Sequence, residues 1–166
     1  MNDTLIAKWN SVVNKNDTVY HLGDYTIEHR KERLKELRAR LNGKIILIAG
    51  NHDRDKVVKH AGIDQIYGHV KHAGIKTYPI VRVDLAGQQI MLCHYSLRTW
   101  DKSHRGVWHL YGHSHGNLVD DPFSLSFDVG VDLHNFTPLS LDEVKVIMSR
   151  KTFRPVDHHE ELETHE

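Results

Sequence analysis

Four short polar clusters recur along the chain, and each follows a run of apolar residues directly or closely. They lie at residues 23–24, 50–53, 94 and 112–115. The apolar runs at 18–22 and 44–49 are too short for independent helices and are typical of buried strands. Open α/β sheets bind ligands at the carboxyl ends of such strands. The clusters therefore predict an α/β fold in which polar side chains converge at strand ends.

The first half of the chain alternates predicted helices and strands. Leu5, Ile6 and Trp9 recur at helical spacing, which predicts an amphipathic helix over 2–14. A second helix is expected over about 27–41, because leucines form an apolar stripe among charged residues there. Helices that alternate with short buried strands are typical of parallel crossover units.

The second half has a different character. Four β-rich runs follow one another, at 78–85, 88–93, 107–111 and 124–131. Only Ala86 and Gly87 separate the first two runs, which predicts a hairpin. Ser140 and Glu143 have the spacing of a capping box, so a last helix is expected to begin there and end near residue 149.

Length and composition indicate one domain and exclude several classes of protein. The chain has 166 residues, and we expect a single domain over 1–150 followed by a charged tail over 151–166. Lys plus Arg equals Asp plus Glu, at 22 each, so nothing indicates a nucleic-acid or membrane partner, except that a nucleotide remains an acceptable substrate. No run is long enough to span a bilayer. The single Cys93 and the lack of a signal sequence favour a cytoplasmic setting.

Each cluster alone is a weak indication of function. Glycine and aspartate are favoured in ordinary turns, and a lone histidine such as His94 is more often a satisfied core residue. His113 and His115 alternate, so an extended backbone would place both imidazoles on one side. Four separate strand ends that all carry oxygen or nitrogen donors are difficult to explain by turns alone. Together they indicate a site for a divalent metal ion.

The clusters and their order resemble the calcineurin-like metallophosphoesterase superfamily. Its pattern runs Asp-x-His, Gly-Asp, Gly-Asn-His-Asp or Glu, His, and Gly-His-x-His. The similarity covers roughly residues 1–148, and the flanks at 108–111 and 128–132 most resemble a group of small bacterial and phage phosphoesterases. The resemblance implies two mixed β-sheets packed as a sandwich with helices on the outside.

The resemblance also implies roles for individual residues. Asp24 would bridge two metal ions, and one ion would be completed by Asn51, His94 and His113. His115 would belong to the other ion. His52 would approach the substrate phosphate and donate a proton to the leaving oxygen. The mixed oxygen and imidazole ligands suit manganese, iron, zinc, cobalt or nickel about equally. Asp53 would either orient its turn or be an exposed surface acid.

One part of the family pattern has no counterpart in the printed chain. The Asp-x-His motif normally ends a strand before the first helix, whereas here that helix begins within a few residues of Met1. Asp132 and His134 have the same spacing, but they lie in the C-terminal flank, and we do not expect them to replace the motif. We therefore expect an N-terminal strand to be missing, one metal site to be complete and the second incomplete. The exposed sheet edge would be covered by a homodimer or by a rearranged terminus.

The substrate is expected to be a small phosphodiester or phosphomonoester, for example a nucleotide. Gly23 and Asp24 continue as Tyr25 and Thr26 rather than as the Val-Asp-Arg-Gly of protein Ser/Thr phosphatases. Three cations between the metal clusters are candidates for holding phosphate oxygens, although solvated loop charges would look the same; they are Arg98, His104 and Arg105.

Two readings of function follow from the sequence. The first is a metal-dependent phosphoesterase whose activity is reduced by the missing first motif. The alternative is a non-catalytic binding or scaffold module that kept the fold. Retention of the amide and imidazole donors favours the enzyme, whereas the absent motif favours the scaffold. A nucleic-acid-binding module is disfavoured by the balanced charge.

Overall fold

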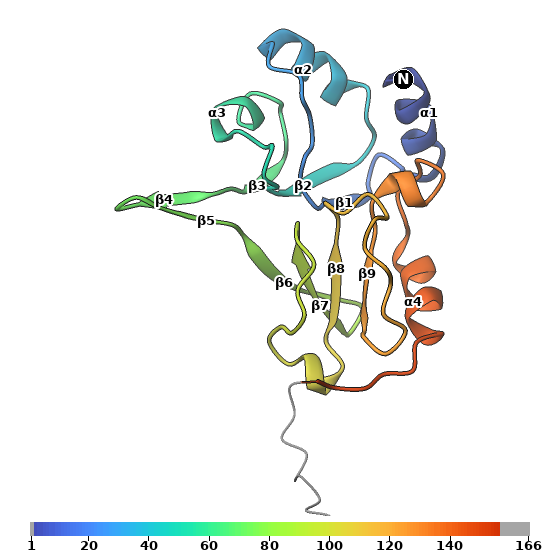
Figure 1. Ribbon diagram of the computed structural model, residues 1–166. Helices are drawn as coiled ribbons and strands as arrows, with labels where there is room; N and C mark the ends of the chain where they lie inside the picture. The colour runs from blue at the N-terminus through green and yellow to red at the C-terminus, as the bar shows by residue number, and fades with distance from the viewer. Residues whose placement is uncertain (1, 157–166) are drawn as a thin grey trace, which may run out of the picture.

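The computed structural model describes residues 2–156, which form two main sheets with helices on the outside (Figure 1). The helices are α1 (Asn2–Val12), α2 (Lys31–Ala39), α3 (Asp55–Val58) and α4 (Leu141–Ser149), with short 3-10 turns η1 (Ser103–Arg105) and η2 (Val131–Leu133). The strands are β1 (Thr18–His21), β2 (Lys44–Ile48), β3 (Gln65–Tyr67), β4 (Val70–His72), β5 (Ile75–Thr77), β6 (Ile80–Leu85), β7 (Gln88–Cys93), β8 (Trp108–Tyr111) and β9 (Ser126–Asp128). The expected α/β architecture is confirmed.

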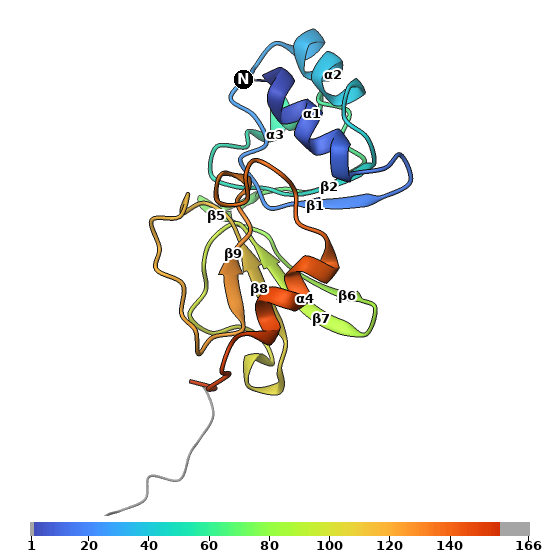
Figure 2. The ribbon, with the colours of Figure 1, turned by 90° about the vertical axis from the view of Figure 1, so that its right-hand side faces the viewer.

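The first sheet is parallel and has the strand order β1-β2-β3. Successive side chains of β2 point to opposite faces, and both faces are covered. Ile46 and Ile48 belong to the core between the two sheets, whereas Ile45 and Leu47 are fully buried on the other face. Helices α1, α2 and α3 cover that other face (Figure 2). The short all-apolar run of β2 is therefore explained by burial on both sides.

The second sheet has the strand order β6-β7-β8-β9. The predicted hairpin is confirmed: β6 and β7 are antiparallel, and Ala86 and Gly87 adopt φ values of 52° and 83° at the turn. Strands β7, β8 and β9 are parallel. Ile90 and Leu92 face the core shared with the first sheet, to which Val144 of α4 also belongs. Because the parallel strands of each sheet end at one edge, the segments after β1, β2, β7 and β8 meet between the sheets.

Three expectations about element boundaries need correction. Helix α2 begins at Lys31 rather than near 27, because the Glu28 carboxylate binds the Arg30 side chain and the amides of His29 and Arg30 in a turn before it. These contacts hold the pKa of Glu28 at about 2. Strand β9 is shorter than expected and ends at Asp128, whose carboxylate accepts a hydrogen bond from the amide of Gly130.

The third correction concerns the C-terminal boundary. The amides of Thr152 and Arg154 donate to the carbonyl groups of Pro122 and Phe123, at 2.9 and 2.8 Å. The side chain of Lys151 is 4% exposed and forms an ion pair with Asp120. The packed part of the chain therefore extends past residue 150. The rest of the expected tail, residues 157–166, lies outside the described residues.

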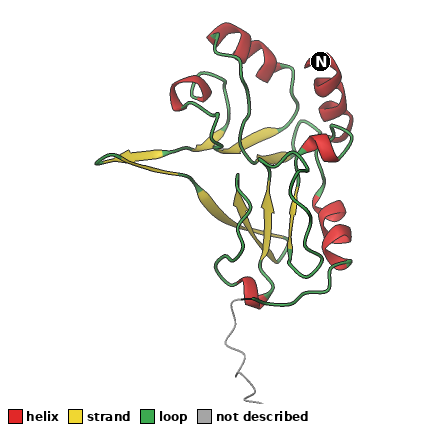
Figure 3. Cartoon of the chain, viewed as in Figure 1, coloured by secondary structure: helices red, strands yellow, loops and turns green. Residues whose placement is uncertain are grey.

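Strands β4 and β5 form a hairpin that was not expected from the sequence. Figure 3 shows it extending away from the two main sheets. All six of its strand residues are exposed, and Lys71 lies directly opposite Lys76. These strands have only three residues each and show no alternation of polar and apolar residues, so the sequence gives no pattern from which strands could be predicted.

Two further features concern the edge of the first sheet and the length of the helices. Strand β1 lies at the edge of its sheet, with no second strand partner among residues 2–156. In the same part of the chain, none of the helices is long and apolar enough to cross a membrane.

Candidate metal centre

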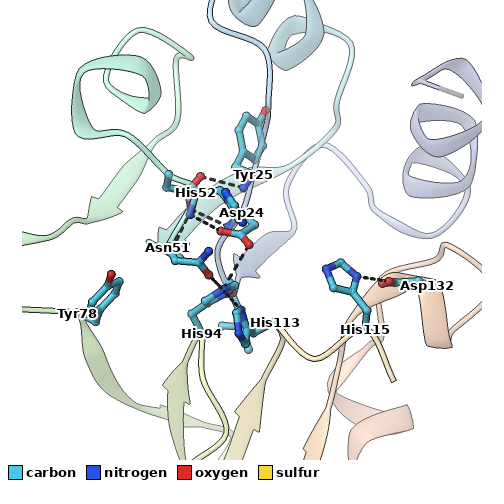
Figure 4. A network of polar contacts seen from close by, with 12 residues as sticks. Asp24, Tyr25, Asn51, His52, Tyr78, His94, His113, His115 and Asp132 are labelled. Atoms are coloured by element: carbon cyan, nitrogen blue, oxygen red, sulfur yellow. Dashed lines mark hydrogen bonds and ion pairs between the residues drawn. The ribbon is translucent and has the colours of Figure 1, made fainter. Parts of the chain in front are cut away.

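Three possible metal ligands meet where the two sheets face each other. Asp24 follows β1, His94 follows β7 and His113 follows β8, and one donor atom from each lies within 4.8 Å of the others. Asn51, from the loop after β2, adds a fourth donor: its Oδ1 lies 2.9 Å from Nε2 of His94 (Figure 4). The structure thus brings together the four residues that the resemblance assigned to one metal site.

The surroundings of His94 determine which of its ring nitrogens carries the hydrogen. Its Nδ1 lies 2.7 Å from the carbonyl oxygen of Leu22, which can only accept a hydrogen bond. In the neutral ring Nδ1 therefore carries the hydrogen, and Nε2 presents its lone pair. Metal-binding histidines are commonly oriented by such a hydrogen bond to a backbone carbonyl.

The atoms facing Nε2 of His94 are themselves electron-pair donors. They are Oδ1 of Asn51 at 2.9 Å, Nδ1 of His113 at 3.1 Å and Oδ2 of Asp24 at 3.4 Å. Metal-ligand bonds of about 2.1 Å place neighbouring ligand atoms roughly 3.0–3.4 Å apart in octahedral or tetrahedral shells. The donor types, and the three separations from Nε2 of His94, therefore fit a divalent cation among these four side chains.

Two glycines allow the strand ends to approach this closely. A Cβ at Gly23 would lie 2.5 Å from Nδ1 of His94 and 2.6 Å from the amide nitrogen of Gly50. A Cβ at Gly50 would lie 2.5 Å from Oδ1 of Asp24. Asp24 itself has a φ of 53°, in the left-handed region that most residues avoid. The cluster depends on this tight local packing.

Asp53 links the loop after β1 to the loop after β2. The residue is 3% exposed, and its carboxylate accepts hydrogen bonds from the amides of Asp24, Tyr25 and Gly50, at 2.7 to 2.9 Å. Of the two expectations for this residue, orientation of the turn is therefore confirmed and an exposed surface acid is wrong. The amide of His52 in turn donates to Oδ1 of Asp24, which leaves Oδ2 of Asp24 for the cluster.

His52 is exposed and helps to line a hollow of about 230 Å³ beside the cluster. Its other lining residues are Thr26, Ile27, His29, Asn51 and Arg54. A larger hollow of about 440 Å³ lies at the far ends of β7 and β8, near Gln88 and Trp108, and contains none of the cluster residues. The smaller hollow is therefore the one positioned for a substrate. His29 and Arg54 were not singled out in the sequence, because exposed basic residues in turns carry no distinguishing signal.

His115 stands apart from the other candidate ligands. Its Nδ1 lies 2.5 Å from Oδ2 of Asp132 (Figure 4), and its donor atoms are not within the group formed by Asp24, His94 and His113. The hydrogen bond to the Asp132 carboxylate raises the pKa of the His115 imidazole. Assignment of His115 to a second metal site stays a prediction. The pairing with Asp132 was not foreseen.

Two of the three expected phosphate-binding cations, His104 and Arg105, lie away from the cluster. The side chain of Gln88, at the start of β7, donates to the carbonyl group of Gly106, which places η1 at that end of the sheet. His94 follows the other end, and the six residues of β7 span roughly 20 Å. The expectation that His104 and Arg105 contact the reacting phosphate therefore needs correction. Arg98 lies in the loop after His94 and is exposed, and its role stays a prediction.

Tyr95 was also overlooked, although it directly follows His94 in the sequence. Its ring packs edge-on against the rings of His94 and His113, with centroids 5.0 and 4.6 Å away. A second edge contact links it to Tyr78 at 5.4 Å. These contacts restrict the orientation of both imidazoles.

Comparisons with known proteins agree with this description. The family described as the calcineurin-like phosphoesterase superfamily domain matches residues 2–130. The uncharacterized protein MJ1445 of Methanocaldococcus jannaschii is 32% identical over 164 residues, which cover 95% of this chain and 81% of the relative. The crystal structure of the protein of unknown function AQ665 from Aquifex aeolicus has a TM-score of 0.61 and 21% identity, and covers 88% of this chain and 84% of that one.

These findings confirm the resemblance inferred from the four clusters. The likeness to the Aquifex aeolicus structure shows a shared fold, and the family match extends from α1 through β9 and includes every residue of the metal cluster. The chain belongs to the calcineurin-like phosphoesterase superfamily.

Proposed function

We propose that the protein is a metal-dependent hydrolase of a small phosphoester, either a phosphodiester or a phosphomonoester. The observation that carries this proposal is the convergence of Asp24, Asn51, His94 and His113. A scaffold would have no chemical need for a buried histidine whose lone pair faces three further donors. The superfamily membership points to the same class of reaction.

In this proposal each chain residue has a defined task. A divalent ion bound by Asp24, Asn51, His94 and His113 would supply a water of lowered pKa and would neutralise the phosphoryl oxygens. The Leu22 carbonyl keeps His94 in the required tautomer. His52, in the wall of the adjacent hollow, donates a proton to the leaving oxygen, which is typically worth about 100-fold or more in rate.

We further propose that one metal ion binds tightly and a second binds weakly. The first would have four protein donors, whereas the second would have only Asp24 and His115 from this chain. Two protein donors are too few for a closed coordination shell. Metal counting after dialysis should therefore give about one ion per chain, and two fully occupied ions per chain would contradict this part of the proposal.

Hydrolysis of bis(p-nitrophenyl) phosphate with added Mn²⁺ tests the proposal. The unchanged chain should release nitrophenol, and Asn51→Ala and His113→Ala should each lower the rate by about 100-fold, because each removes a proposed metal ligand. His72→Ala is the matched control, since His72 is an exposed histidine on the β4–β5 hairpin. Equal rates in all four proteins would eliminate the enzyme and favour the scaffold.

A further inference from the structure

The hollow beside Asn51 lies where a leaving group would go, if the proposed function is correct. Asn51 belongs both to its wall and to the metal cluster, so the hollow adjoins the proposed metal site. His52, the proposed proton donor to the leaving oxygen, lies in the same wall. An alcohol that departs toward His52 must therefore enter this hollow. Its lining then selects the chemistry of the leaving group.

The lining of this hollow is basic. Its side chains include His29, His52 and Arg54, and none of the lining residues is acidic. Arg54 is exposed, and its guanidinium has no carboxylate partner within residues 2–156. An arginine beside a metal centre that attracts phosphate is well suited to a second phosphate, because its planar donors match phosphate oxygens in pairs.

The acidic residues next to Arg54 in the chain, and the one within the lining segment 26–29, are engaged elsewhere. Asp53 directs its carboxylate to three backbone amides. Asp55 faces His69, with 3.4 Å between Oδ1 and Nδ1. Glu28 is held by the Arg30 side chain and the neighbouring amides. None of them neutralises Arg54, so its charge is left for a ligand.

The size of the hollow limits what that ligand can be. Its volume is about 230 Å³, whereas pockets for drug-sized ligands usually have about 300–1,000 Å³. A phosphate on a short carbon chain matches both the size and the charge.

We propose that the hollow binds a second phosphate group carried by the leaving alcohol, so that the preferred substrate is a small bisphosphorylated compound. In this hydrolysis, the bond between phosphorus and the leaving oxygen would break, and the oxygen of a water molecule would bond to phosphorus. That water releases one proton to solvent. His52 gives a proton to the leaving oxygen and regains one from solvent. The second phosphate stays intact and is held by Arg54.

Two matched substrates test this proposal. Propyl phosphate and propane-1,3-diol bisphosphate differ only in the second phosphate, and phosphate release is measured with Mn²⁺ present. Because the bisphosphate has two equivalent ester groups, a twofold preference is expected from statistics alone. The unchanged chain should prefer the bisphosphate by at least about tenfold in kcat/KM, the effect of one charged hydrogen bond. A preference of only twofold would overturn the proposal.

Variants of Arg54 test whether the preference for the bisphosphate depends on the hollow. Arg54→Gln should lower the preference to near twofold, and Arg54→Lys should restore part of it. Arg150→Gln is the control, because Arg150 is an exposed arginine that follows α4 and is not part of the hollow. A preference that survives in Arg54→Gln would also overturn the assignment.

Calorimetry separates this proposal from the proposed function. If neither compound is hydrolysed, hydrolysis of bis(p-nitrophenyl) phosphate still decides the hydrolase proposal, and titration of the Mn²⁺-loaded chain still tests the hollow. The bisphosphate should then bind about tenfold more tightly than propyl phosphate, and Arg54→Gln should remove the difference. If propyl phosphate is hydrolysed and the two compounds bind equally, only the second-phosphate site is refuted.

Discussion

The Nδ1 atom of His94 lies 2.7 Å from the carbonyl oxygen of Leu22, two residues before Asp24 on the neighbouring sheet. The backbone of the loop after β1 therefore sets the tautomer of a side chain that follows β7. Nε2 of the same ring is directed at the donors of Asn51, His113 and Asp24. The orientation of the His94 ring therefore depends on how the two sheets pack against each other, and not only on the loops.

The tautomer of His94 can be measured directly. Long-range ¹H–¹⁵N NMR spectra of the metal-free protein should show His94 with its hydrogen on Nδ1, because Leu22 offers only an acceptor. The resonances are assigned by their loss in His94→Gln. A hydrogen on Nε2 would contradict the role given to Leu22.

Removal of the His94 ring should weaken metal binding strongly. His94→Gln removes the donor that faces all three others, and we expect the Mn²⁺ dissociation constant to rise by about 100-fold. Isothermal titration of Mn²⁺ into both proteins measures this change, with His72→Ala as the control for an exposed histidine. An unchanged dissociation constant would show that the metal binds elsewhere.

A methyl group at Gly50 should damage both stability and the metal centre. The added Cβ would lie 2.5 Å from Oδ1 of Asp24, so the strand end and the carboxylate must shift. We expect Gly50→Ala to lower the free energy of unfolding by about 1–3 kcal/mol and to weaken Mn²⁺ binding. Gly68→Ala is the control, because a Cβ there meets its nearest atom at 3.5 Å. Urea unfolding and metal titration give both quantities, and equal behaviour of the two variants would refute the packing argument.

Loss of the Asp53 carboxylate should loosen the two loops. Asp53→Ala leaves the amides of Asp24, Tyr25 and Gly50 without their acceptor. A buried amide without a partner costs about 1–3 kcal/mol, and partial solvation of the loops reduces the sum, so we expect a loss of about 2–4 kcal/mol in urea unfolding. A loss below about 0.5 kcal/mol would mean that water replaces the carboxylate easily.

The Asp64 carboxylate predicts a pH dependence of stability. Hydrogen bonds from the Ile45 amide and the Arg38 side chain hold the pKa of Asp64 below its ordinary value. Its stabilisation is therefore fully present above the unfolded pKa of about 3.9 and is lost as the pH falls through the native pKa. Asp64→Asn should be less stable than the unchanged chain at pH 7, and the gap should narrow below about pH 4. A gap that is constant between pH 7 and pH 3 would contradict this.

The expected homodimer stays a prediction. Strand β1 presents an open edge among the described residues, and such edges favour pairing with a second strand. Light scattering over a range of protein concentrations should detect a dimer. A monomer at every concentration would remove this expectation.

The sequence predicted the fold well where burial imposes a pattern. The apolar run of β2 and the hairpin turn at Ala86 and Gly87 were both identified correctly, because burial on two faces and positive φ each restrict residue choice. The start of α2 was misplaced, since the side-chain contacts of Glu28 override helix propensity. The β4–β5 hairpin carries no such pattern.

The site was predictable only in part. The meeting of Asp24, Asn51, His94 and His113 follows from strand ends that share one edge. The position of η1 could not be predicted in this way. The loop after His94 runs back to the far end of the sheet, where the side chain of Gln88 contacts the carbonyl group of Gly106. Proximity in sequence to a metal cluster therefore gave a false indication for His104 and Arg105.

Anomalous diffraction from crystals soaked in Mn²⁺ would locate the metal ion itself. We expect one strong manganese peak bonded to Nε2 of His94, Nδ1 of His113, Oδ2 of Asp24 and Oδ1 of Asn51, each at about 2.0–2.3 Å. A crystal in which manganese binds elsewhere, or in which these four atoms hold no ion at saturating Mn²⁺, would contradict this expectation.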